Sequence, residues 1–525
     1  MASFSWRRSS WRRGLILVPC ALAAAMPAQA AMATAPSRQA EAAAPSAPLE
    51  GLDAYIEQAR ADWGVPGAAV VIVKDDRIVY AKGFGVREAG KPGRVDADTV
   101  FAIGSASKAF TGAALGMLVD ERKIAWDGVV HDYMPAFELH DPYATRHATV
   151  RDLLAHRTGF ISGSGWMWTG SGFDRADIVR RLRFQTESHG FRNRFAYANE
   201  IYTAAGEIIP AVTGISWDDF VAARLFAPLG MTRSRTSVTA LKDMANVASP
   251  HGMIDGQVVS FPYREVDNVG GAGAINASAR DVAQWLRLQL NDGMFEGRRL
   301  ISAAALAETR TGQIVPRGGG LTNPGGRFGE YGFGWILGDY RGKKVVQHSG
   351  GVDGMLCIVA MIPEEKLGVV VLSNMLPHQL TTAVQLKIFD AFLGGPGSDW
   401  NATLKAQDAK TRAEMEKRRA AQAAASPADA APMLPLGRYA GHYASDQFGA
   451  VDVAVEKGAL TLTRPTATAV LTPAGGNRFK ARWTSAGLRS VFGETAVGFT
   501  IDAAGDVAAL ELGGDRFARA AGPDI

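Results

Sequence analysis

The position of the strand-forming segments along the chain limits its fold more than any other feature. Residues 67–85, "GAAVVIVKDDRIVYAKGFG", contain two β-rich runs around the turn-forming pair Asp75–Asp76, which predicts an antiparallel hairpin. Further strand patterns follow much later, in residues 331–340, 343–350 and 354–374. The residues between, from about 105 to 290, have helical and loop character. This order predicts an α+β fold, in which strands from both ends of a domain form one antiparallel sheet, flanked by helices and with a helical lobe inserted.

The first thirty residues have the pattern of a secretory signal peptide. A basic start with four arginines precedes the short apolar run of residues 14–26, and "AQA" at Ala28–Ala30 is a small-residue cleavage motif. The run is too short to span a bilayer, so we expect no stable membrane span after cleavage. Paired arginines before an apolar stretch are compatible with twin-arginine as well as Sec export. The sequence therefore predicts a periplasmic or secreted protein.

The charge of the chain indicates which partners to expect, and its cysteines indicate whether a reactive thiol is present. The full chain carries 56 Lys and Arg against 52 Asp and Glu, and cleavage after Ala30 would remove four arginines and no acid, which leaves 52 of each sign. A neutral mature chain offers no basic surface, so we expect no nucleic-acid partner. Cys357 would be the one cysteine left, and its apolar setting, "GMLCIVAMI", predicts a buried and inert thiol.

Composition divides the chain into five segments. We expect a signal peptide at 1–30, a disordered linker rich in Ala, Pro and Ser at 31–48, the main domain at 49–396, a helical and then Pro-Ala-rich linker at 397–434, and a small all-β domain at 435–525. The last segment alternates polar and apolar residues at strand period, with Gly or Asp turns, as a barrel or a sandwich does.

Ser105 and Lys108 form the first candidate for catalytic chemistry. Three positions apart at the start of a helix, their side chains share one face. A serine hydroxyl is a weak nucleophile until a base sits beside it, and a lysine serves as that base when desolvation or nearby positive charge keeps it neutral. A helix start also favours the negative charge that develops during attack.

Tyr197 and Asn199 form a second candidate, in "FAYANEIY". They are two apart, so in an extended segment both point the same way. A tyrosine close to a lysine ammonium loses its proton more easily than a free phenol and can then relay the serine proton. Asn199 offers a donor and an acceptor to a substrate amide. Taken alone, the segment also fits an aromatic run packed under a helix.

A third candidate follows the strand pattern of "VVQHSGGVDG". Its polar and glycine residues are His348, Ser349, Gly350 and Gly351. Glycines after a strand let a ligand approach the backbone closely. His348 can orient a proton relay or bind substrate, although a lone histidine is more often structural.

In order, the three segments read S-x-x-K, Y-x-N and H-x-G. With "VPGAAVVIV", "VRDLLAHRTGF", "PLGMTRS" and "YGFGW", they make the chain from about 50 to 395 resemble the serine β-lactamase and penicillin-binding protein superfamily. The likeness is to its class C-like branch, which includes esterases and D-aminopeptidases. It implies a β-lactamase/transpeptidase-like fold, and the C-terminal segment resembles a small β-barrel domain often appended to such hydrolases.

The resemblance implies a role for each candidate. Ser105 would be the acylated nucleophile, with Lys108 and Tyr197 sharing general-base and general-acid work, and the order of their proton transfers is open. The backbone N–H groups of Ser105 and Gly351 would form the oxyanion hole. Substrate would be bound by Asn199, His348, Ser349 and Gly350. No metal or other cofactor is implied.

Two features between the first two motifs complete the site region. Residues 159–173 are rich in Gly and Ser and contain Trp166 and Trp168, which fits either a mobile flap over the site or a surface loop with buried tryptophans. His156, before a Thr–Gly turn, is expected to be structural and to hold that turn.

These observations predict an exported serine hydrolase that cleaves amide or ester bonds of a small-molecule or peptide substrate, as a peptidase, D-aminopeptidase or esterase. His348 stands where typical β-lactamases have a lysine, and histidine is largely neutral above its reference pKa of about 6.5. That weakens the fit to the carboxylate of a β-lactam, although ring opening as a side activity stays open. The alternatives are a true class C-like β-lactamase and a non-catalytic penicillin- or peptidoglycan-peptide-binding protein. Oligomeric state is left open.

Overall fold

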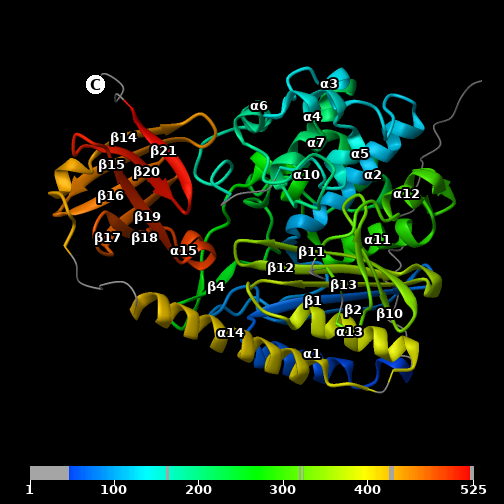
Figure 1. Ribbon diagram of the computed structural model, residues 1–525. Coiled ribbons are helices and arrows are strands. Elements are labelled where there is room, and N and C mark those ends of the chain that lie inside the picture. Colours follow the sequence, from blue (N-terminus) through cyan, green and yellow to red (C-terminus); the bar gives the residue numbers. More distant parts are fainter. Residues whose placement is uncertain are drawn as a thin grey trace, which may run out of the picture. The chain divides into compact units, whose positions relative to one another are not determined.

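The computed structural model describes residues 47–160, 165–317, 321–322, 324–395, 397–424 and 431–520. The predicted signal peptide and nearly all of the predicted linker at 31–48 lie outside the described residues. Within the described part, the chain forms a mixed α/β domain and a C-terminal β-barrel (Figure 1).

The main domain is built on an antiparallel sheet to which both ends of the domain contribute. In the described residues it has seven strands, in the order β2-β1-β13-β12-β11-β10-β9. Their bounds are β1 Gly67–Lys74, β2 Arg77–Gly85, β9 Gly329–Tyr331, β10 Ile336–Tyr340, β11 Lys343–Val352, β12 Met355–Ile362 and β13 Leu367–Ser373. Val70 of β1 lies opposite Val371 of β13. The predicted hairpin is present, and Asp75 and Asp76 turn it with φ of 50° and 61°.

Both faces of the sheet are covered, which explains why its central strands are apolar throughout. Alternate residues of β1 point to opposite faces: Val71 belongs to one hydrophobic cluster and Val70 to the other. Helices α1 (Leu52–Asp62) and α13 (Leu380–Leu393) cover one face, while α2 (Ser107–Asp120) and α11 (Ala279–Leu290) lie on the other (Figure 1). The sheet is therefore the middle layer of the domain.

The predicted helical lobe lies between β2 and β9 in the sequence. Its remaining helices are α3 Val130–Tyr133, α4 Pro142–His147, α5 Val150–Leu154, α6 Arg175–Arg181, α7 Asn199–Thr213, α8 Trp217–Val221, α9 Ala227–Leu229, α10 Gly270–Gly273 and α12 Ala303–Thr309. Short strand pairs join them: β3 Val100–Ala102 with β6 Asn276–Ser278, β4 His251–Ile254 with β5 Gln257–Ser260, and β7 Met294–Phe295 with β8 Arg298–Arg299. None of the described helices is both long and apolar enough to cross a membrane.

The segment predicted as a helical linker begins as part of the main domain. Helix α14 (Trp400–Ala424) extends past the predicted helix end near residue 419. In its first turn, Asn401 Oδ1 accepts the Trp63 indole N–H at 2.8 Å, and Trp400 donates its own to Asp390 at 2.8 Å. These bonds attach the start of α14 to the main domain.

The C-terminal segment forms a closed barrel. Its strands are β14 Gly441–Ser445, β15 Gly449–Glu456, β16 Ala459–Arg464, β17 Ala467–Pro473, β18 Arg478–Trp483, β19 Glu494–Ile501, β20 Val507–Leu512 and β21 Asp515–Ala520, with α15 (Ala486–Phe492) between β18 and β19. Pairing of β14 with β21 closes it, which decides between the barrel and sandwich alternatives.

Barrel residues pack against the Trp166 region of the main domain. The Trp166 ring centroid lies 5.0 Å from that of Trp483 and 4.8 Å from that of Phe492. Arg464 of β16 donates to the Trp166 carbonyl at 3.0 Å. With only 1% of its surface exposed, Trp166 fits the expectation of a buried tryptophan. Residues 161–164 of the same segment lie outside the described residues.

Candidate active site

Ser105 lies in a short 3₁₀ turn, Gly104–Ala106, that leads directly into α2. It thus precedes the α-helix on which the spacing placed it, while Lys108 occupies the first turn. Gly104 has φ of 50°, and a Cβ at this position would lie 2.9 Å from the backbone N of Gly351. The turn is held by Ser107, whose hydroxyl donates to the Gly104 carbonyl at 2.7 Å. A side chain at position 104 would therefore push Ser105 away from β11.

Two predicted partners meet at the Ser105 hydroxyl. The Tyr197 hydroxyl donates to Ser105 Oγ at 2.8 Å, and Lys108 Nζ lies 3.2 Å from the same oxygen. Ser105 is partly exposed, whereas Lys108 is fully buried. The structure thus leaves the hydroxyl open to a substrate and keeps the amine behind it.

The contacts of Lys108 fit a neutral amine. Its Nζ donates to Asn199 Oδ1 at 2.8 Å and to the Ala272 carbonyl at 2.9 Å. In the neutral amine, these two acceptors take both hydrogens of the NH₂ group, and the lone pair then faces the Ser105 hydroxyl at 3.2 Å. Burial lowers the pKa of Lys108 well below its usual value, and the charge of Glu200 opposes this shift without reversing it.

Tyr197 behaves differently from the sequence expectation. We expected the lysine to lower the pKa of the phenol, but burial raises it. Burial outweighs the hydrogen bond with Ser105, which lowers the pKa of the phenol. Tyr197 therefore keeps its proton at neutral pH and acts as a hydrogen-bond donor to Ser105.

Asn199 begins α7 and is the acceptor that holds Lys108 in place. Asn199 was predicted to bind substrate. In the structure, its side-chain oxygen accepts a hydrogen bond from Lys108. A contact between Asn199 and a substrate amide stays a prediction.

His348 is part of the site, with both ring nitrogens engaged by the protein. Its Nδ1–H donates to the Ser349 carbonyl at 2.6 Å, so Nε2 is the acceptor for the Tyr331 hydroxyl at 3.0 Å. Burial lowers the pKa of His348 to about 3. The ring is therefore neutral, and substrate binding by His348 stays a prediction that requires one of these bonds to be exchanged.

Tyr331 is a residue of this site that sequence reasoning missed. It lies at the end of β9, is fully buried, and its ring centroid is 5.8 Å from that of His348. The stretch "YGFGW" contains it, but a tyrosine before a glycine turn carries no signal of its own. Its contact with His348 of β11 becomes apparent only when the order of strands β9, β10 and β11 in the sheet is known.

The two glycines of β11 have separate functions in packing. A Cβ on Gly350 would lie 1.8 Å from the Ile103 carbonyl, so this glycine lets β11 approach the turn that carries Ser105. Gly351 and Ser349 face outward and are exposed. The close approach of Gly351 to Gly104 brings together the two segments whose N–H groups were predicted to form the oxyanion hole.

Cys357 lies beneath this turn on β12. Its thiol donates to the Ile103 carbonyl at 3.1 Å, and burial raises its pKa to about 12. The thiol is buried, as predicted, and stays protonated at neutral pH.

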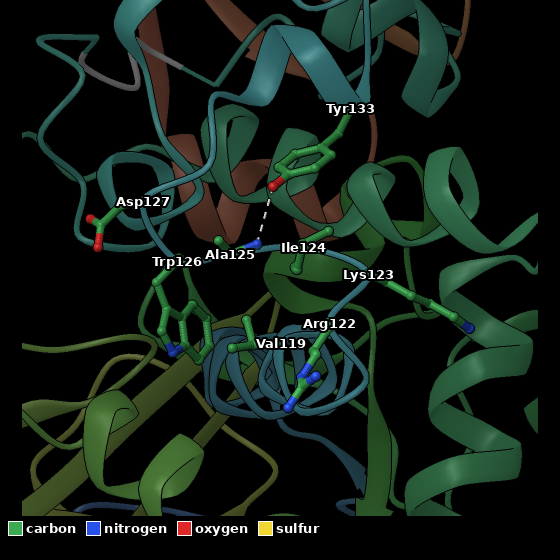
Figure 2. A pocket seen from close by; sticks show the side chains of 8 residues that line it. All are labelled: Val119, Arg122, Lys123, Ile124, Ala125, Trp126, Asp127 and Tyr133. Carbon is green, nitrogen blue, oxygen red and sulfur yellow. Dashed lines mark hydrogen bonds between the residues drawn. The ribbon is translucent and has the colours of Figure 1, made fainter.

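A separate hollow of about 540 Å³ lies at the opposite end of α2 (Figure 2). It is lined by Val119, Arg122, Lys123, Ile124, Ala125, Trp126, Asp127 and Tyr133. The Tyr133 hydroxyl accepts the Ala125 N–H there at 3.1 Å. The length of α2 places this hollow roughly 20 Å from Ser105, and none of its residues was predicted to be catalytic.

Solved structures with the same fold include a penicillin-binding protein homologue and a class C β-lactamase. The octameric penicillin-binding protein homologue from Pyrococcus abyssi matches with a TM-score of 0.60 and 22% identity, over 89% of this chain and 99% of that one. The class C β-lactamase from Rhodobacter sphaeroides matches with a TM-score of 0.54 and 20% identity, over 65% of this chain and 99% of that one. At these identities, the comparisons establish the fold alone.

Sequence comparison identifies related proteins and two matching family models. The unguisins hydrolase ungD of Aspergillus violaceofuscus is 29% identical over 78% of this chain and 77% of its own length. Penicillin-binding protein 4 of Amycolatopsis lactamdurans is 29% identical over 60% of this chain and 82% of its own. Residues 425–520 match a domain of unknown function, DUF3471. Residues 52–391, which contain the whole site, match the Beta-lactamase family model, and the chain therefore belongs to the β-lactamase family.

Proposed function

We propose that this protein is an exported serine hydrolase that cleaves an amide or ester bond through an acyl-enzyme on Ser105. The observation that carries the proposal is the surrounding of Lys108 Nζ. Two oxygen acceptors take its hydrogens at 2.8 and 2.9 Å, and the Ser105 hydroxyl lies at 3.2 Å on the remaining side. This arrangement supplies a neutral base next to a nucleophile.

In the first step, Lys108 takes the Ser105 proton while Oγ attacks the substrate carbonyl carbon. The oxyanion that forms is stabilised by the backbone N–H groups of Ser105 and Gly351. Lys108 is favoured over Tyr197 as the first base, because burial lowers the pKa of the amine and raises that of the phenol.

In the second step, the bond to the leaving group breaks. Tyr197, 2.8 Å from Ser105 Oγ, gives its proton to the departing amine or alkoxide, and the Lys108 ammonium then reprotonates the phenolate. Water attacks the resulting ester with Lys108 again as base, and the proton returns to Ser105 Oγ. Lysine, tyrosine and serine all end as they began.

We propose a peptidase, D-aminopeptidase or esterase rather than a dedicated β-lactamase. A neutral His348 occupies the place at which a typical β-lactamase has a permanent cation, so the site lacks that charge for the drug's carboxylate. The sequence similarity to the unguisins hydrolase ungD supports a hydrolytic role. The predicted signal peptide supports export to the periplasm or the medium.

A fluorescent phosphonate probe tests the central claim. We expect it to label the wild type and not Ser105→Ala, with both proteins folded by circular dichroism. Absence of labelling in the wild type would favour the non-catalytic binding protein instead. A screen of p-nitrophenyl esters, D- and L-amino acid amides and nitrocefin then ranks the substrate classes, and turnover of nitrocefin above all others would favour the true β-lactamase.

A further inference from the structure

We propose that His156 is a positioning residue for Tyr197, and that it holds the phenol at the nucleophile by fixing the backbone on both sides of it. The proposal rests on the proposed function of Ser105 and Tyr197. It extends beyond the sequence expectation that His156 only stabilises its own turn.

The geometry is a two-point attachment. The backbone carbonyl of His156 accepts the Ala196 N–H at 2.8 Å, and its side-chain Nδ1 accepts the Ala198 N–H at 3.1 Å. Tyr197 is the residue between these two donors. Its ring centroid lies 4.4 Å from that of His156, so the imidazole contacts the ring as well as the chain.

The conformation of His156 is one that few side chains adopt. Its φ is 53°, in the left-handed region. The turn around it is fixed by the N–H of Arg157, which donates to the Asp152 carbonyl at 3.1 Å, and by the ion pair of the same two residues at 2.6 Å. A residue kept in a disfavoured conformation at a reactive centre indicates a geometric requirement there.

The imidazole is kept in the form that this attachment needs. Since Nδ1 accepts a hydrogen bond, the proton of the neutral ring is on Nε2. Burial lowers the pKa of His156 well below its usual value. Aromatic rings surround it, with centroid distances of 5.7 Å to Phe195, 5.0 Å to Tyr202 and 5.0 Å to Tyr331.

The test compares three replacements of His156. Asn places Oδ1 where Nδ1 was, Gln moves its acceptor one bond further out, and Leu removes it. We measure kcat/KM for an amino acid amide, whose leaving group needs a proton, and for a p-nitrophenyl ester, whose leaving group does not. If the enzyme accepts no amide, an alkyl ester takes its place.

We expect His156→Leu to lower kcat/KM by about 10- to 100-fold more for the amide than for the ester, and we expect the same of Tyr197→Phe. His156→Asn should recover most of this loss, and His156→Gln little. The Leu and Phe changes combined should cost no more than either alone, because they disable one function.

Equal losses on both substrates, or losses that multiply in the double variant, would overturn the proposal. If His156→Leu does not fold, the comparison of the Asn and Gln variants tests the proposal. Each is then assayed at the same interval below its own melting temperature. Failure of the proposed function is seen separately, because Ser105→Ala would then still hydrolyse the ester.

Discussion

The side chain of Asn199 is bound to Lys108: its Oδ1 accepts a hydrogen bond from Lys108 Nζ at 2.8 Å. A neutral amide at this point fixes the direction of the amine without adding charge. An uncharged residue 199 therefore leaves the effect of burial on the pKa of Lys108 in place.

Replacing Asn199 with Asp places a carboxylate in contact with the amine. An opposite charge at this distance raises the pKa of Lys108 by about 1–3 units, so the acid limb of the kcat/KM profile should move to higher pH by the same amount. Below the raised pKa, activity falls about tenfold per pH unit, and it returns at higher pH. Asn199→Ala serves as the uncharged control, and a limb that moves upward equally in that variant would refute the explanation.

Lys108→Ala and Ser105→Ala should each reduce turnover by orders of magnitude, since general-base catalysis alone contributes about 10²- to 10⁴-fold. The double variant should be no slower than the worse single variant, because the two residues act as a unit. Steady-state kinetics with one ester measures this, with circular dichroism as the check on folding. Near-normal activity of Lys108→Ala would show that the base is assigned wrongly.

Tyr331→Phe removes the donor to His348 Nε2 and leaves a buried nitrogen without its bond. We expect the free energy of unfolding to fall by about 1–3 kcal/mol in urea denaturation. Tyr133→Phe is the matched control, because the Tyr133 hydroxyl bonds an exposed backbone N–H that water can satisfy instead. Equal losses in the two variants would mean that the buried bond has no special weight.

Buried histidines should make the protein sensitive to mild acid. Burial lowers the pKa of His348 and of His378 to about 3, against about 6.5 in an unfolded chain. Above pH 6.5, these histidines are neutral in both the folded and the unfolded chain, so they do not lower the free energy of unfolding. As pH falls from about 6.5 towards 3, only the unfolded state binds it, and each histidine costs about 1.4 kcal/mol of stability per pH unit.

Urea denaturation between about pH 7 and pH 5 measures this slope. His378→Gln, which changes none of the residues proposed for the active site, should reduce it by about 1.4 kcal/mol per pH unit. An unchanged slope in that variant would contradict the buried, neutral state of His378.

Trp166→Ala should destabilise the protein by about 3–5 kcal/mol, because it removes a fully buried indole from between the main domain and the barrel. Trp168→Ala, at a half-buried position of the same segment, should cost less. Thermal denaturation with an intrinsic fluorescence readout compares the two. A smaller effect at position 166 than at 168 would argue against tight packing of the barrel on this segment.

The sequence predicted the layout of the sheet because its signals are local. Runs such as β1 and β13 are apolar on both faces, and the Asp75–Asp76 turn fixes the hairpin. Spacing also identified Ser105 and Lys108 as neighbours. The contacts of Tyr331 and His156 were not predicted, since they arise from pairing between segments that no periodicity connects.

The direction of the Tyr197 pKa shift was wrong for a physical reason. A sequence shows which charges are present but not how much water reaches them. Burial dominates at both residues: it raises the pKa of Tyr197 and lowers that of Lys108, the group on whose charge the expectation relied.

The pairing of Val70 with Val371 also has a consequence for how the chain matures. During synthesis, one edge of the first hairpin must wait for a partner made about 300 residues later, which at about 5–20 residues per second is some 15–60 s. Until then a very apolar strand edge is open to mispairing with other nascent chains. A chaperone that covers this edge until β13 is made would therefore raise the yield of this protein. The gain should be larger than for a protein whose sheet is completed early in synthesis.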